Sequence, residues 1–199
     1  MGRRADLVDQ TRQRITEAAV RLHTSVGPSA TSMSAVADEA GVTRLTLYRH
    51  FPSKDGLFGA CMGHWRSLHP PPDPDGWRAI PTFEARVRGA LGDLYGWYGE
   101  NGDDLYPIYR DAAYTPVSNQ RARQATNERM VDAALGEAGV GDSARHLRAA
   151  LGHVVGFWTW RSLVVDQGLS TAEASAMAAE FVLANAPSMR RHGETGRVR

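Results

Sequence analysis

The apolar residues of this chain recur at helical spacing over almost its whole length. Ile15, Ala18, Ala19 and Leu22 follow the i, i+3, i+4, i+7 pattern of a helix with one apolar face, and similar patterns continue between Gly and Pro residues as far as Leu183. We find no internal repeat and no alternation typical of a strand. The pattern therefore predicts an all-α chain.

Breaks divide the first third of the chain into four predicted helices. Gly27-Pro28-Ser29 ends the first helix, Thr31 or Ser32 is placed to cap the second, and Gly41 ends the second. A third helix of roughly two turns follows, and a fourth is expected over residues 54–65. In the stretch GVTRLTLYRHFPSK, four residues are expected to be buried: Val42, Leu45, Leu47 and Phe51.

A proline-rich segment, SLHPPPDPDGW, separates this part from longer predicted helices. Its prolines exclude a helix, so residues 67–81 are expected to form a linker. Beyond it, the periodicity predicts helices over 82–100, 103–113, 115 to the glycines at 136–141, 143–167 and 170–186. The last begins with the capping box Ser170–Glu173 and ends at Pro187, and residues 188–199 are expected to be disordered.

The composition is that of a soluble globular protein, with 42% of the 199 residues hydrophobic and 23% charged. The net charge of +1 is distributed unevenly, because residues 1–66 carry nine Arg/Lys against six Asp/Glu and residues 67–199 carry fourteen against sixteen. Arginine supplies nearly all of the positive charge. Its planar group suits phosphates and base edges, although a GC-rich genome would give the same bias.

Several classes of protein are disfavoured. Cys61 is the single cysteine, which excludes an internal disulfide and a multi-cysteine metal site. The GxGxxG, P-loop and GxSxG motifs are missing, so we predict no cofactor. The longest near-apolar run, residues 149–160, is far shorter than the roughly 20 residues of a membrane span. The first residues do not resemble a signal peptide, and we expect a cytoplasmic protein without membrane contact.

The spacing of small and apolar residues over 37–51 predicts a helix-turn-helix. Ala37 lets two helices cross closely, Gly41 takes the turn conformation, and Leu47 and Phe51 pin the second helix to the first. The second helix of such a motif lies in the major groove of DNA. A DNA partner therefore explains why so short a segment carries so many polar side chains.

Residues 31–57, TSMSAVADEAGVTRLTLYRHFPSKDGL, resemble the DNA-binding signature of the TetR family of transcriptional regulators. The signature comprises a hydroxyl before the second helix, A-x-x-A-G-V-[ST], L/F-Y-x-H-F and [SN]-K-x-x-L, and only Val36, where isoleucine is commoner, departs from it. The resemblance implies an N-terminal three-helix helix-turn-helix DNA-binding domain, residues 1–66. It also implies a larger helical ligand-binding and dimerisation domain, residues 82–187.

The resemblance and the chemistry together assign the DNA contacts. Thr43, Arg44 and Thr46 lie at the start of the recognition helix, where we expect contacts to bases, and Arg44 is the best candidate for a bidentate contact to guanine. The remaining predicted contacts are to phosphates, with Arg49 able to serve either role. These residues are Thr31 or Ser32 at a helix N-terminus, Tyr48, Arg49, His50 and Lys54.

Residues 149–165, AALGHVVGFWTWRSLVV, are apolar on more than one face and must be covered on all of them. Other helices of the domain cover these faces if the segment lies at its centre, or a second copy of the chain covers one of them. With the last helix, this segment makes a plausible four-helix dimer interface, as the resemblance also implies. Two recognition helices roughly 34 Å apart would then contact a palindromic operator. The predicted interface residues are Leu151, Trp158, Ala172, Ala176, Ala179 and Leu183.

Aromatic residues with polar tips gather in the same domain, where the resemblance implies a cavity for a small effector. We expect that effector to be aromatic or lipophilic. Its binding is expected to change the distance between the two DNA-binding domains of a dimeric repressor, which then leaves its operator. The coupling is expected where the turn at 114–117 or the helix at 103–113 presses on the fourth helix. The predicted ligand-binding residues are Tyr95, Tyr98, Tyr106, Tyr109, His153, Phe157 and Trp160. Each has an alternative role in the core, and for His153 the core role is favoured.

Two other functions are weighed against this one. An enzyme is disfavoured because Cys61 and His64, one turn apart, have no third orienting group, and because His146 and His153 have no carboxylate that would complete a metal site. A ligand-independent DNA-binding or architectural factor stays open, since the same signature would serve it.

Overall fold

The computed structural model describes residues 2–139 and 144–186, so the predicted disordered tail, residues 188–199, lies outside the described residues. Within them every regular element is helical, which confirms the all-α prediction. The first four helices are α1 (Gly2–Ser25), α2 (Met33–Glu39), α3 (Arg44–His50) and α4 (Lys54–Leu68). None of the described helices is both long and apolar enough to cross a bilayer.

The remaining helices form the larger part of the molecule. They are α5 (Pro74–Arg78), α6 (Phe83–Arg110), α7 (Val117–Leu135), α8 (Ala144–Val154), α9 (Phe157–Arg161) and α10 (Thr171–Ala184). Short 3-10 turns, η1 (Ala112–Tyr114) and η2 (Gly136–Gly139), flank α7, and a π-helical turn, η3 (Ser162–Asp166), follows α9.

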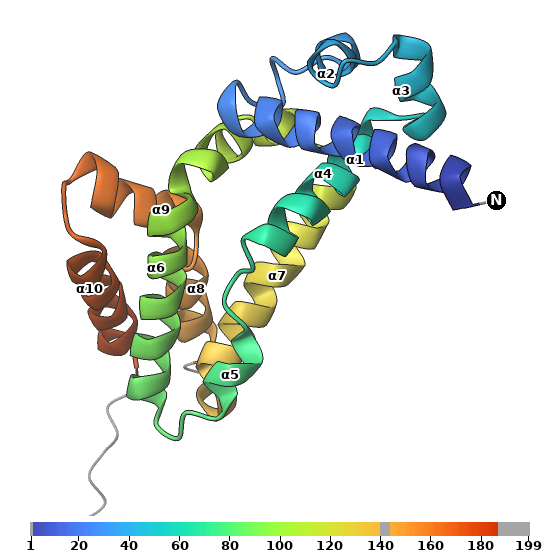
Figure 1. Ribbon diagram of the computed structural model, residues 1–199. Coiled ribbons are helices and arrows are strands. Elements are labelled where there is room, and N and C mark those ends of the chain that lie inside the picture. Colours follow the sequence, from blue (N-terminus) through green and yellow to red (C-terminus); the bar gives the residue numbers. More distant parts are fainter. Residues whose placement is uncertain (1, 140–143, 187–199) are drawn as a thin grey trace, which may run out of the picture.

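Figure 1 shows α1 lying across the end of α6 and the start of α4, with α2 and α3 beyond it at one extremity of the molecule. α1 packs on both α4 and α6. α6 runs through the centre of the larger part, where α10 and α7 pack against it, and α8 packs against α7. We call α1 to α4 the head and α5 to α10 the body.

The predicted linker contains a helix, α5, so its description as wholly non-helical was wrong. Asp73 caps α5 by accepting a hydrogen bond from the Asp75 N–H at 3.1 Å, and Pro74 occupies the first turn, where a missing N–H has no partner to lose. Trp77 is buried, and its Nε1 donates to Asp93 Oδ2 on α6 at 2.8 Å. The proline-rich segment is a packed connection, and the domain boundary itself stays a prediction.

One helix, α6, replaces the two predicted over 82–100 and 103–113. Gly102 lies inside this helix at a point where an added Cβ would collide with the Trp160 ring of α9. The glycine therefore allows an indole to approach the backbone closely and does not end the helix. Pro107 is in the last turn of α6, which continues to Arg110.

The predicted helix over 143–167 is interrupted between α8 and α9. Three backbone carbonyls at the break accept side-chain hydroxyls: the Tyr95 hydroxyl donates to Val154 O at 3.0 Å, that of Tyr98 to Val155 O at 2.9 Å, and that of Thr159 to His153 O at 2.7 Å. These donors satisfy carbonyls that a continuous helix would have paired internally. The two tyrosines come from α6, so periodicity along residues 143–167 contains no sign of the break.

Candidate functional site

The turn between α2 and α3 has the geometry that the sequence predicts. Gly41 adopts φ +62°, a left-handed conformation suited to glycine. Its N–H donates to Asp38 O at 3.1 Å, and the next N–H, of Val42, donates to Ala37 O at 2.9 Å. Leu47 and Phe51 are buried, so α3 is fixed to the head by one face and presents the other outward.

Two arginines of α1 brace this pair of helices. Arg14 donates to Ala40 O, at the end of α2, at 3.1 Å, and Arg12 donates to His50 O, at the end of α3, at 2.9 Å. The Arg12 guanidinium also lies 4.2 Å from the centre of the Phe51 ring. A positive charge is favourable at a helix C-terminus, where carbonyls are unpaired. Sequence reasoning counted these arginines only as general positive charge, because their partners lie far along the chain.

The outward face of α3 carries the residues predicted to contact bases. Thr43 caps the helix by accepting from the Thr46 N–H at 3.1 Å, and the two threonine hydroxyls lie 2.9 Å apart. Arg44 is exposed at the first turn, as its predicted role requires. Leu45 is 72% exposed, so the expectation that it is buried was wrong. Its direction in the first turn is away from the contact with α2, and it is a candidate functional residue that the sequence analysis missed.

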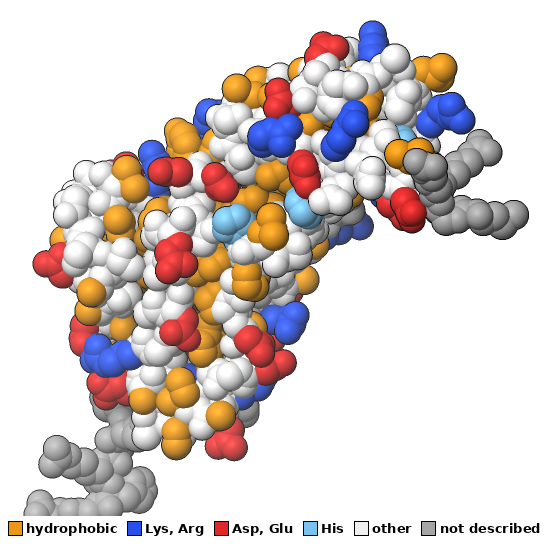
Figure 2. Space-filling view, viewed as in Figure 1, with side chains coloured by type: hydrophobic (Ala, Val, Ile, Leu, Met, Phe, Trp, Pro, Cys, Tyr) orange, Lys and Arg blue, Asp and Glu red, His pale blue; other side chains and the backbone are white. Residues whose placement is uncertain are grey.

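The predicted phosphate-contacting residues surround the same face. Tyr48, Arg49 and Lys54 are exposed and His50 is half-buried. Figure 2 shows Lys and Arg side chains gathered towards this end of the molecule. The two hydroxyls before α2 already have partners, since Ser32 Oγ accepts from the Ala35 N–H at 3.1 Å and the Thr31 hydroxyl donates to Gly27 O at 2.8 Å.

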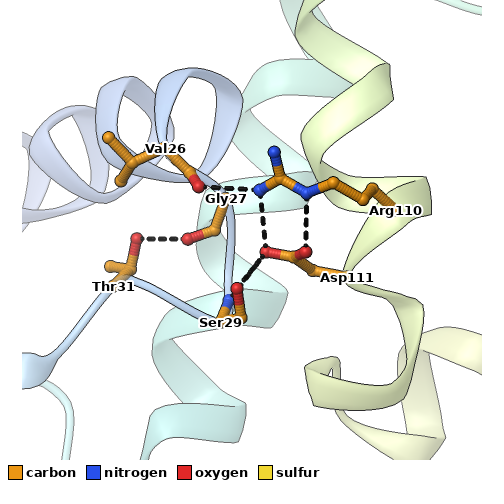
Figure 3. Close-up of polar contacts among 6 residues, drawn as sticks. All are labelled: Val26, Gly27, Ser29, Thr31, Arg110 and Asp111. Carbon is orange, nitrogen blue, oxygen red and sulfur yellow. Dashed lines mark hydrogen bonds and ion pairs between the residues drawn. The ribbon is translucent and has the colours of Figure 1, made fainter.

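A cluster of polar contacts joins the head to the end of α6 (Figure 3). Arg110 donates from Nε and Nη2 to the two oxygens of Asp111, at 2.8 and 3.1 Å, and from Nη2 to Val26 O at 2.8 Å. Ser29 donates to Asp111 Oδ2 through its N–H at 3.0 Å and its hydroxyl at 2.6 Å. We call Val26, Gly27, Ser29, Arg110 and Asp111 the junction cluster.

The junction cluster stabilises the ionised form of Asp111, whose side chain is 8% exposed. The ion pair with Arg110 and the two hydrogen bonds from Ser29 hold the pKa of this carboxyl far below its ordinary value. Gly27 adopts φ +94°, and an added Cβ would collide with both Arg110 Nη2 and Asp111 Oδ2. The α1–α2 turn and the end of α6 are therefore fitted to each other closely.

Of the two contacts expected between the body and the fourth helix, the structure shows the one from residues 103–113, now the end of α6, whose Asp104 accepts from Trp65 of α4. Tyr114 and Val117 are exposed, and they line one side of a groove of about 380 Å³ whose other side includes Lys54 and Leu57 of α4. The turn at 114–117 thus leaves a groove beside α4. The head and the body are joined by the packing of α1 on α6, by the junction cluster, and by a hydrogen bond from Trp65 Nε1 of α4 to Asp104 Oδ2 of α6 at 2.8 Å.

The cysteine considered as a nucleophile pairs with a different histidine. Cys61 Sγ lies 3.3 Å from His23 Nδ1 in the core of the head. Burial raises the pKa of the Cys61 thiol to about 12 and lowers the pKa of His23 to about 4. Both groups are neutral near pH 7, so this thiol is a packed core group. In the part of the chain that the structure describes, no cluster of His, Cys, Asp or Glu could hold a metal ion.

The residues predicted to bind an effector occupy three different settings. The hydroxyls of Tyr95 and Tyr98 bond the carbonyls at the α8–α9 break, and Phe157 and Trp160 are buried core residues. Tyr106 is half-buried, with the Arg161 guanidinium 4.0 Å from its ring centre. Of the seven predicted residues, Tyr98 and Tyr109 line cavities between α4, α6 and α7.

The preference for a buried His153 was wrong. Its side chain is exposed near the end of α8, where it lies 6.2 Å ring to ring from Phe181 of α10. With Thr159, Leu163, Met177 and Phe181 it borders a shallow hollow of about 190 Å³.

The residues predicted to form the dimer interface differ in their exposure. Leu151 and Ala179 are fully buried within the single chain, so they are not available to a second copy. On α10 the face buried within the chain consists of Ala174, Ala178, Ala179 and Val182, so of the predicted stripe only Ala179 belongs to it. Trp158, Ala172 and Ala176 are exposed and Leu183 is half-buried. The exposed apolar surface beside them is supplied by Val165, Met177 and Phe181.

Residues 15–61 match the family described as bacterial regulatory proteins, tetR family. Over 49 residues the chain is 47% identical to the HTH-type transcriptional regulator AcrR of Shigella flexneri, a match that covers 25% of this chain and 23% of that regulator. The sequence likeness therefore concerns the head, and it spans about a quarter of the length of the curated relative.

The whole chain is similar in fold to solved structures. It resembles a tetR-family transcriptional regulator from Streptomyces coelicolor with a TM-score of 0.64 and 17% identity, covering 89% of this chain and 80% of that one. It also resembles NalD of Pseudomonas aeruginosa, the secondary repressor of the MexAB-OprM multidrug efflux pump, with a TM-score of 0.60 and 17% identity over 89% and 95% of the two chains. At these identities the likeness concerns the fold.

Proposed function

We propose that this chain, which matches the TetR family of transcriptional regulators over residues 15–61 and resembles solved structures of that family in fold, is a sequence-specific DNA-binding repressor and not an enzyme. The observation that carries the proposal is α3, which buries Leu47 and Phe51 and exposes Arg44, Leu45, Tyr48 and Arg49. Arg12 of α1 braces the end of α3 and Arg14 braces the end of α2 before it, so the outward side chains start from a fixed backbone. Preorganised side chains on a short helix suit insertion into a major groove.

Within the groove, Arg44 donates to guanine and Leu45 packs on a thymine methyl group. Tyr48, His50 and Lys54 bind phosphates and fix the position of α3 on the duplex. The charge of Lys54 lies at the N-terminus of α4, where backbone N–H groups also favour a phosphate. Thr43 and Thr46, which bond each other, hold the first turn of α3 in shape.

The repressor acts as a homodimer whose two heads contact the halves of a palindromic operator. The exposed apolar side chains of Trp158, Val165, Met177 and Phe181 support an interface on this side of the body, since such a patch is uncommon on a monomer surface. A small effector binds between α4, α6 and α7 and favours a conformation with lower operator affinity. The junction cluster then carries the movement of α6 to the head.

Footprinting on the DNA that flanks the gene of this protein tests the proposal, with and without a panel of small molecules. Protection of two half-sites about one helical turn apart is expected. Protection that no compound in a broad panel weakens would favour the ligand-independent factor.

Replacement of the base-contacting arginine sharpens the test. Arg44→Ala is expected to weaken binding to the operator by about 1–3 kcal/mol and to relax the preference at one base pair. Arg78→Ala, an exposed arginine on α5, serves as the control and should leave binding unchanged. An unchanged base preference for Arg44→Ala would contradict the assignment of Arg44 as a base contact.

A further inference from the structure

Two small cavities lie between α4, α6 and α7, with volumes of about 50 and 80 Å³. They share four lining residues: Arg66 of α4, Trp97 and Tyr109 of α6, and Arg123 of α7. Together the cavities approach the ~150 Å³ that accommodates one benzene ring in a protein core. A ligand of this size would need only the shared side chains to move.

The lining is positively charged and contains no acidic residue. Arg66 and Arg123 supply two guanidinium groups, and in the described part of the chain neither forms an ion pair or a hydrogen bond. Two acidic groups on the helices that line the cavities are engaged elsewhere, since Asp104 of α6 accepts from Trp65 and Glu128 of α7 accepts from Gln124.

The two arginines act on the same point in the cavity. The Arg123 guanidinium lies 4.7 Å from the centre of the Tyr109 ring, which holds it at the cavity wall. Burial raises the pKa of Tyr109, and the charges of Arg123 and Arg66 both oppose that rise. Both positive charges are therefore felt at the Tyr109 hydroxyl, where an anionic group of a ligand would find them together.

The remaining walls combine aromatic and aliphatic side chains with four polar ones, those of Thr115, Asn119, Thr126 and Asn127. Tyr109 stacks on Phe157 with ring centres 4.4 Å apart, and Trp97 lies 5.4 Å from Tyr98. These neighbours fix the orientation of the two rings that face the cavities. A planar apolar group fits between such walls, whereas a bare inorganic anion would leave them without a partner.

We infer that the effector is a small aromatic acid, one ring bearing a carboxylate, with the ring against Trp97 and the edge of Tyr109 and the carboxylate on Arg66 and Arg123. Arginine suits this role because its planar group binds a carboxylate through paired hydrogen bonds. The anion links α4 to α7, and α4 begins at Lys54, a residue of the DNA-binding surface. This inference rests on the proposed function in one respect, because the acid regulates DNA binding only if an effector controls the repressor. Binding of the acid to the site can be tested separately.

Isothermal titration of the full chain with benzoate and with benzamide tests the binding site, because the two ligands have nearly the same shape and differ in charge. Benzoate is expected to bind at least about tenfold more tightly, as charge-assisted hydrogen bonds predict. Arg66→Gln and Arg123→Gln should each reduce that preference about tenfold, and the double variant should abolish it. Arg129→Gln, on an exposed part of α7 that lines neither cavity, should leave it unchanged.

Inorganic phosphate at the same concentration is expected to bind more weakly than benzoate, because it cannot use the aromatic walls. Equal affinity for benzoate and benzamide, no binding of benzoate at millimolar concentration, or a benzoate affinity that survives both arginine replacements would overturn the inference. Circular dichroism of the double variant distinguishes loss of the site from loss of the fold.

Operator binding measured in the same titrations separates this inference from the proposed function. Release of DNA by benzoate, lost in the double variant, supports both. Release by an uncharged compound alone would leave the repressor proposal standing and overturn the aromatic-acid effector. Arginine-dependent binding of benzoate without any effect on DNA would establish the anion site and contradict effector control through it.

Discussion

The helix starts of the head and the break between α8 and α9 of the body are stabilised in different ways. In the head, a side-chain hydroxyl caps each of α2, α3 and α4 by accepting a hydrogen bond from the backbone N–H three residues later. The capping residues are Ser32, Thr43 and Ser53. In the body, the carbonyls at the α8–α9 break accept from tyrosines 57 and 59 residues away, and Arg86 donates to Ala134 O from 48 residues away. Local contacts can be recognised in a short stretch of sequence, whereas distant ones depend on the packed fold.

The junction cluster combines local contacts with contacts between residues distant in the sequence. Replacement of Gly27 is its most severe test. Gly27→Ala is expected to lower the free energy of unfolding by about 4 kcal/mol, because it adds backbone strain at φ +94° and displaces the Arg110–Asp111 pair. Gly168→Ala is the matched control, since φ is +74° there and no atom lies within 4 Å of the added Cβ. It should cost about 2 kcal/mol. Equal losses for the two variants in urea unfolding would show that the junction cluster contributes little.

The same contrast explains how far the sequence could predict the structure. The head was predicted nearly helix by helix, because Gly41, the caps and the apolar positions around Leu47 are local signals. Leu45 was misassigned because an apolar residue at the start of a short helix can face either way, and only the angle between α2 and α3 decides. In the body, the continuity of α6 through Gly102 depends on Trp160, and the break after Val154 depends on α6. Neither cause is visible in the segment that it changes.

The pair of His23 and Cys61 is a distant contact within the head, and it predicts a pH dependence. The pKa of His23 is lowered to about 4 by burial, so the unfolded chain binds the extra proton between pH 6.5 and 4. Stability is fully present above pH 6.5 and is lost as the pH falls to 4, by about 3 kcal/mol in all.

Urea unfolding at a series of pH values measures this loss. His23→Gln is expected to remove most of the fall between pH 6.5 and 4, while His64→Gln, which changes a half-buried histidine on α4, should keep it. Asp111 contributes its own loss only at lower pH, because its carboxyl must be protonated below its ordinary pKa. A variant lacking His23 that loses stability as steeply as the parent would refute the assignment.

A smaller effect is expected from the tyrosine that supports the helix break. Tyr98→Phe removes the hydroxyl that donates to Val155 O and leaves a buried carbonyl without that partner, at a cost of about 2 kcal/mol. Tyr114→Phe, which alters a ring that is 72% exposed, is the control and should be neutral. If Tyr98→Phe proves neutral in thermal unfolding, water or a shifted backbone satisfies the carbonyl, and the body depends less on distant contacts than the structure indicates.

The smallest effect concerns the DNA-binding surface of the head, where contacts are local and exposed. Lys54→Ala removes one positive charge at the N-terminus of α4 and is expected to weaken binding to all sequences alike. It should also reduce the slope of log K against log salt concentration by about 1, because one fewer counterion is released from the DNA. Arg44→Ala provides the comparison, since its loss should fall mainly on the operator. Fluorescence anisotropy over a range of salt concentrations measures both, and an unchanged slope for Lys54→Ala would place Lys54 outside the phosphate contacts.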